Sequence, residues 1–145
     1  MSSVDHPPEI LPGRKGGCLC GAVRYVLKGE QGAAAICHCR HCQKQSGGLF
    51  SFNLFVREED YEQQGETGVF ETRGDSGQPS YRHFCRGCGS PITTRVAMMP
   101  GLVLVKAGTL DSLAGLLPPL TEIYTDHAVE WLMRFEGTAR FARSP

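Results

Sequence analysis

The sequence lacks an excess of charge of either sign, and it lacks a long apolar run. Fifteen basic residues balance 15 acidic residues, so the formal net charge is zero. A protein that binds nucleic acid through the phosphate backbone needs a clustered basic surface, so this composition argues against nucleic acid as a partner. No apolar run approaches the roughly 20 residues that a membrane helix needs, so we expect no membrane partner either.

The N-terminal segment also lacks the basic stretch followed by an apolar stretch that marks a secretory signal peptide. We expect residues 1–13 to form a flexible arm and residues 14–145 to form a single domain. The expected location is cytoplasmic, where thiols stay reduced. A P-loop, a Gly-x-Ser-x-Gly motif and a dinucleotide-binding fingerprint are absent as well.

Cysteine is present only in clusters. The seven cysteines form three short motifs: Cys18-Leu-Cys20, Cys37-His-Cys39-Arg-His-Cys42 and Cys85-Arg-Gly-Cys88. Thiolates spaced two or three residues apart can bind one soft cation, and zinc is the usual one. A disulfide framework is the alternative, but the odd number of cysteines argues against it.

The first and third clusters have the features of two halves of a closed zinc site. Each is followed by glycine, which permits the positive φ of a zinc knuckle. Cysteines at i and i+2 of an extended segment also point to the same side. We therefore predict a structural zinc site with four ligands: Cys18, Cys20, Cys85 and Cys88.

The middle cluster supplies three thiolates within six residues, namely Cys37, Cys39 and Cys42. Three local ligands can hold a second zinc and leave one coordination position open. Two alternatives to this division remain open. All seven cysteines could form one structural cluster, or Cys42 could be a free thiol. The nearby histidines are interpreted as polar neighbours rather than ligands: His38, His41 and His83.

Short strands separated by turn residues predict a mainly β fold of short antiparallel strands with little helix. Strands are expected at residues 22–27, 33–39, 49–56, 69–73, 81–84, 91–96, 102–107 and 135–141. One or two helical turns are expected within 57–64, and a short helix at 126–132. We expect core packing for the single tryptophan and three phenylalanines: Trp131, Phe50, Phe52 and Phe55. For Phe50 or Phe52, the alternative is a position lining the open zinc site.

Three segments carry a resemblance to a known family, and each contains one cysteine cluster: residues 16–25, 37–47 and 84–92. In this order they resemble the glutathione-dependent formaldehyde-activating enzyme family, also described as S-(hydroxymethyl)glutathione synthase-like and including centromere protein V-like members. The resemblance implies an Mss4-like fold and two Zn²⁺ ions per chain. It places the structural zinc on the four-cysteine set and the catalytic residues at Cys37, Cys39 and Cys42.

Three thiolates leave a bound Zn²⁺ with a net charge near −1, which disfavours metal-assisted hydrolysis and favours a thiol as fourth ligand. With the resemblance, this predicts a carbon–sulfur lyase whose partners are a small thiol and an aldehyde. An example is S-hydroxymethylglutathione formed from glutathione and formaldehyde. The alternative is a non-enzymatic zinc scaffold that binds a protein partner or a small thiol.

Three basic residues lie beside the cysteine motifs: Arg40, Lys44 and Arg86. We expect them either to bind a substrate carboxylate or to balance the negative charge of the zinc–thiolate centres. The alternative is that they are simply solvated surface residues. The sequence does not indicate which oligomeric state the protein adopts.

Overall fold

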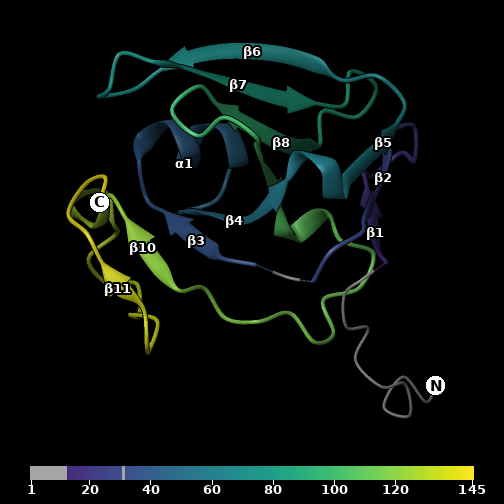
Figure 1. Cartoon of the computed structure of the whole chain (residues 1–145). Coiled ribbons are helices and arrows are strands. Elements are labelled where there is room, and N and C mark those ends of the chain that lie inside the picture. Colours follow the sequence, from purple (N-terminus) through teal and green to yellow (C-terminus); the bar gives the residue numbers. More distant parts are fainter. Residues whose placement is uncertain (1–12, 31) are drawn as a thin grey trace.

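Two β-sheets form the framework of the computed structural model, which describes residues 13–30 and 32–145 (Figure 1). The flexible arm predicted at residues 1–13 lies outside the described residues, except for Gly13. The single domain predicted at residues 14–145 stays a prediction. The smaller sheet has the order β1-β2-β5 and is antiparallel. Its strands are β1 (Arg14–Gly17), β2 (Arg24–Leu27) and β5 (Tyr61–Gln64).

The larger sheet has eight strands in the order β11-β10-β3-β4-β9-β8-β7-β6. Its strands are β3 (Ala34–Cys37), β4 (Ser51–Arg57), β6 (Gly68–Arg73), β7 (Pro79–Phe84), β8 (Pro91–Val96), β9 (Leu102–Lys106), β10 (Thr121–Ile123) and β11 (Ala139–Arg140). The prediction of a mainly β fold is confirmed. The sheet is not wholly antiparallel, because β10 runs parallel to both β3 and β11. The long connection after β9 returns the chain so that β10 enters in the direction of β3.

The two faces of the larger sheet differ in polarity. One face is apolar and contributes Ala34, Leu54, Val103 and Val105 to the hydrophobic core. The opposite face, here called the polar face, follows from the strand register. Cys37 pairs with Ser51, Asn53 with Lys106, Leu104 with Thr94, and Thr94 with Arg82. Paired residues of neighbouring strands project to the same side of a sheet.

One α-helix, α1 (Arg40–Ser46), is present among the described residues, and it lies between the β6–β7 hairpin and the β3–β4 pair (Figure 1). The sequence analysis did not predict this helix, which begins directly after Cys39 because Cys39 acts as the N-cap and its sulfur accepts a hydrogen bond from the Cys42 amide at 3.3 Å. Gly47, with φ of 74°, ends the helix in the left-handed conformation that glycine adopts without strain.

The remaining helical segments are single 3₁₀ turns: η2 (Glu58–Asp60), η3 (Ala107–Thr109) and η4 (Thr125–His127). The short helix predicted at 126–132 is therefore wrong beyond its first residues. Within 57–64, one helical turn forms as predicted, but residues 61–64 form strand β5. No helix in the described part of the chain is long and apolar enough to cross a membrane.

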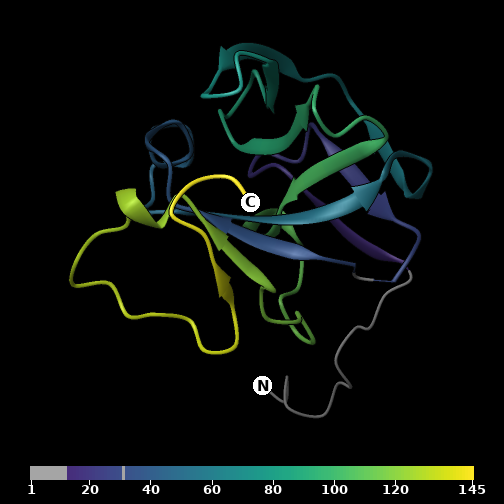
Figure 2. The same cartoon turned by 60° about the vertical axis from the view of Figure 1, so that its left-hand side comes forward.

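The expectation that Trp131 packs in the core is wrong, since 75% of its surface is exposed. It belongs to the segment between η4 and β11, which has no regular secondary structure and forms a wide loop in Figure 2. Phe52 instead packs against the core as predicted. Phe50 makes an edge contact with Phe135, with ring centroids 5.5 Å apart.

Candidate metal sites

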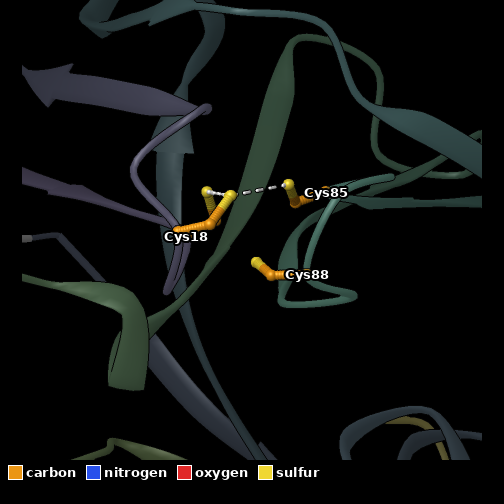
Figure 3. Close-up of side chains that lie close together, drawn as sticks. Cys18, Cys85 and Cys88 are labelled. Atoms are coloured by element: carbon orange, nitrogen blue, oxygen red, sulfur yellow. Dashed lines mark hydrogen bonds between the residues drawn. The ribbon is translucent and has the colours of Figure 1, made fainter.

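The first and third cysteine clusters meet, although 65 residues separate Cys20 from Cys85. Cys18 and Cys20 follow β1 of the smaller sheet, whereas Cys85 and Cys88 follow β7 of the larger sheet (Figure 3). All four sulfur atoms lie within 4.8 Å of one another. The Sγ–Sγ distances are 3.6 Å for Cys18–Cys20 and 3.7 Å for Cys20–Cys85. Zinc–sulfur bonds of about 2.3 Å in a tetrahedron place sulfurs about 3.8 Å apart, so this set fits one zinc ion.

The backbone around this four-cysteine site is shaped for thiolates. Gly89 has a φ of 80° and donates its amide to the Cys85 carbonyl at 2.8 Å, which closes the tight turn. The Val23 amide donates to the Cys18 sulfur at 3.2 Å. Hydrogen bonds from the Ser90 hydroxyl and from backbone groups of Ser90 and Cys20 lower the pKa of Cys88 to about 5. Such hydrogen bonds stabilise the ionised sulfur that a metal requires.

The middle cluster forms a separate group on the polar face. Cys37 is the last residue of β3, Cys39 caps α1, and Cys42 lies in the first turn of that helix. Their sulfur atoms also lie within 4.8 Å of one another. Cys37 and Cys42 are each 7% exposed and Cys39 is half-buried. Within the described residues, no histidine, aspartate, glutamate or further cysteine joins this group.

The cysteines therefore divide four and three in space, as the sequence predicts, and Cys42 belongs to the second group. All seven are free of disulfides. A donor set made only of thiols favours a soft or borderline cation such as zinc over magnesium or calcium. Both groups fit the zinc that their spacing predicts, the first as a closed site and the second as a site with an open position.

The nearby histidines belong to neither group. His38 is 1% exposed, and its Nε2 lies 3.0 Å from Glu122 Oε1. His83 Nδ1 lies 2.9 Å from the Thr67 hydroxyl, and His41 is exposed. Their expected role as polar neighbours agrees with this placement.

Two buried cations lie on the polar face beside the three-cysteine site, and sequence analysis missed both. Arg82 and Lys106 are each 6% exposed, and Arg82 Nη1 lies 3.9 Å from Cys42 Sγ. The three cations expected from the motifs are instead all exposed: Arg40, Lys44 and Arg86. Closeness in sequence to the cysteine motifs therefore does not identify the buried positive charges near the site. The useful signal is strand alternation, which places Lys106 and Arg82 on the face of Cys37 once the register is known.

The thiols of the three-cysteine site influence one another. Contacts with Cys37 and Cys39 lower the pKa of Cys42, and the positive charge of Lys106 lowers it further. Contacts with Cys39 and Cys42, together with burial, raise the pKa of Cys37. The three thiols therefore titrate as one group, and the nearby positive charge of Lys106 favours its ionised form.

Comparisons with known proteins agree with this geometry. A family model described as glutathione-dependent formaldehyde-activating enzyme matches residues 13–127, which include all seven cysteines. No curated protein gives a significant match. Among solved structures, a Rhodobacter sphaeroides protein determined as a structural-genomics target is 22% identical with a TM-score of 0.55, and the match covers 72% of this chain and 91% of that chain. At this identity the likeness shows a shared fold.

Proposed function

The chain belongs to the glutathione-dependent formaldehyde-activating family, whose fold is Mss4-like, and from this membership we propose that it is a zinc-dependent carbon–sulfur lyase-type enzyme. The proposed reaction forms or cleaves a thiol–aldehyde adduct, such as S-hydroxymethylglutathione from glutathione and formaldehyde. The proposed metal content is two Zn²⁺ ions per chain. Cys18, Cys20, Cys85 and Cys88 would hold a structural ion, and Cys37, Cys39 and Cys42 would hold a catalytic ion.

The observation that carries this proposal is the convergence of three cysteine sulfurs without a fourth protein ligand among the described residues. A zinc ion held by Cys37, Cys39 and Cys42 would offer its open position to a thiol and keep that thiol deprotonated. Cys39 is the most exposed of the three, so it marks the side from which a substrate can approach.

The reaction itself needs no oxidant or reductant. A bond forms between the thiol sulfur and the carbonyl carbon, and the thiol proton ends on the carbonyl oxygen. The reverse reaction breaks the same carbon–sulfur bond and returns the proton to sulfur. The chain contributes bound and oriented sulfur, and Arg82 places positive charge on the polar face beside Cys42.

The test is the rate of adduct formation from glutathione and formaldehyde, followed by exchange NMR with and without protein. Wild-type protein is expected to accelerate the exchange, with saturation in glutathione. Cys37→Ser is expected to abolish the acceleration while one zinc ion, in the four-cysteine site, is retained in native mass spectrometry. Full activity of Cys37→Ser protein with that ion in place would contradict the proposed mechanism.

The alternative function is a non-enzymatic zinc scaffold, and the same experiment separates the two. A scaffold would retain two zinc ions and bind glutathione without any acceleration of the exchange. A reducing compartment such as the cytoplasm is the proposed location, supported by seven cysteines that are free of disulfides.

A further inference from the structure

The polar face of the larger sheet buries two positive charges. Lys106, at the end of β9, is 6% exposed, and its Nζ donates a hydrogen bond to Asn53 Oδ1 at 2.9 Å. Arg82, in β7, is also 6% exposed, and its Nε donates to the Thr72 hydroxyl at 3.1 Å. Both hydrogen-bond partners are neutral, so neither balances the charge.

Neither cation has a carboxylate partner among the described residues, since neither belongs to an ion pair there. The one buried carboxylate in that part of the chain is Glu122, which pairs with His38 and Arg140 instead. Burying an ammonium or guanidinium group without a counter-charge costs roughly several kcal/mol for each ion. The negative charge that balances Arg82 and Lys106 must therefore come from another kind of group.

The cysteine sulfurs on the polar face can provide that charge. Cys42 Sγ is 3.9 Å from Arg82 Nη1. Lys106 lies on the same face as Cys37, because Lys106 pairs with Asn53 of β4 and Cys37 pairs with Ser51 of the same strand. Three thiolates and one divalent cation sum to −1. The two buried cations change this sum to +1, so the metal-loaded site is not an isolated buried anion.

We propose that Arg82 and Lys106 are positioning residues that stabilise Cys37, Cys39 and Cys42 in their metal-bound, ionised form through their positive charge. This inference rests on the proposed function only in taking the three-cysteine site to hold a divalent ion. The four-cysteine site, at the ends of β1 and β7, is the internal comparison, because the hydrogen bonds of Arg82 and Lys106 in the described part of the chain go to Thr72, Cys42 and Asn53 instead.

The rival explanation is that Lys106 serves only as a hydrogen-bond donor that fixes Asn53. Three substitutions separate charge from hydrogen bonding. Lys106→Met removes both, Lys106→Gln removes the charge and keeps an N–H donor, and Lys106→Arg keeps both. Lys28→Met is the matched control, because Lys28 is an exposed lysine that pairs with Glu62.

The experiment is native mass spectrometry of zinc-loaded, full-length proteins at increasing chelator concentration. The four-cysteine ion in the same molecule is the internal reference, and Cys37→Ser identifies which ion is lost first. The three-cysteine ion of Lys106→Met and Lys106→Gln should be lost at a chelator concentration about tenfold or more below that of wild type, because one charge at close range is worth at least this factor. Lys106→Arg and Lys28→Met should behave like wild type.

A second readout is the sulfur-to-metal charge-transfer absorption during titration with Co²⁺, which reports ligation without any turnover. Wild-type affinity in Lys106→Gln would overturn the inference and leave the proposed function intact. If Lys106→Met loses both ions together it has unfolded, and Lys106→Gln then decides between the two explanations. A wild-type protein that binds only one ion would contradict the proposed function and this inference together.

Discussion

At the residue scale, Glu122 joins the C-terminal strands to the three-cysteine region. The side chain is 1% exposed, and its Oε1 faces His38, which lies between Cys37 and Cys39. Its Oε2 accepts hydrogen bonds from the Thr138 hydroxyl and from Arg140 Nη1, each at 2.6 Å. Burial raises the pKa of Glu122, but the hydrogen bonds from Thr138, His38 and Arg140 outweigh it, so the pKa lies below its ordinary 4.5.

Glu122→Gln should lower the free energy of unfolding by about 2–4 kcal/mol at pH 7, because it removes one partner of a buried ionic network. A lowered folded-state pKa means that this stabilisation is fully present above the unfolded pKa and is lost as the pH falls through the folded pKa. Urea unfolding at several pH values should therefore show a constant difference from wild type above about pH 5 and a narrowing one below pH 4.5. The exposed Glu130→Gln is the control. A difference that stays constant down to pH 3 would contradict the prediction.

At the scale of single elements, the end of β5 depends on a glycine. Gly65 has a φ of 89°, and a Cβ at this position would lie 2.2 Å from the Ala22 carbonyl oxygen. Ala22 belongs to the loop that carries Cys20. Gly77, in the β6–β7 hairpin, has a similar φ of 74° but open space where a Cβ would be. An alanine at Gly77 would therefore add only backbone strain, whereas an alanine at Gly65 would add both strain and a steric clash.

Gly77→Ala should cost about 1–2 kcal/mol, which is the strain of a left-handed alanine. Gly65→Ala should cost about 3 kcal/mol or more, because the loop before β2 must also move. Thermal unfolding of the two variants is the measurement. Equal losses of stability would show that Gly65 has no steric role.

Most strands of this protein are predictable from the sequence, because apolar alternation marks them locally. Strand β8 begins and ends at the predicted residues, and β4 and β9 differ only at their ends. The sequence did not predict β1, β5, β10 or α1. Strand β10 has three residues and depends on pairing with β3. Helix α1 depends on a cysteine N-cap, which ordinary capping preferences do not include.

In the candidate site too, features set by nearby residues could be predicted from the sequence, and features that depend on strand order could not. The cysteine spacing, the glycines that follow the first and third clusters and the family resemblance together predicted the two groups, since each motif is local and ligand geometry is strict. The positive charge around the site could not be assigned by spacing, because β4 lies between Lys106 on β9 and Cys37 on β3, and β4, β9 and β8 lie between Arg82 on β7 and Cys37. A pattern of alternation shows that these residues share a face only when the order of strands in the sheet is known.

At the scale of the whole molecule, the two candidate ions have different structural consequences. The four-cysteine site joins the end of β1 in the smaller sheet to the end of β7 in the larger sheet (Figure 3). An ion there links segments 65 residues apart in the chain. The three-cysteine site uses ligands within six residues, so an ion there closes only a short loop. Loss of the first ion therefore releases more conformational freedom in the chain than loss of the second ion does.

Removal of the four-cysteine ion should destabilise the fold far more than removal of the three-cysteine ion. In a protein of this size 1 kcal/mol corresponds to roughly 2–4 °C in Tm, so we expect Cys85→Ser to lower Tm by more than about 10 °C and Cys37→Ser by only a few degrees. Calorimetry of both variants, with zinc content measured on the same samples, is the test. Similar losses of Tm would mean that both ions support the fold equally. The three-cysteine site would then be structural, and the argument for an open, reactive position would fail with it.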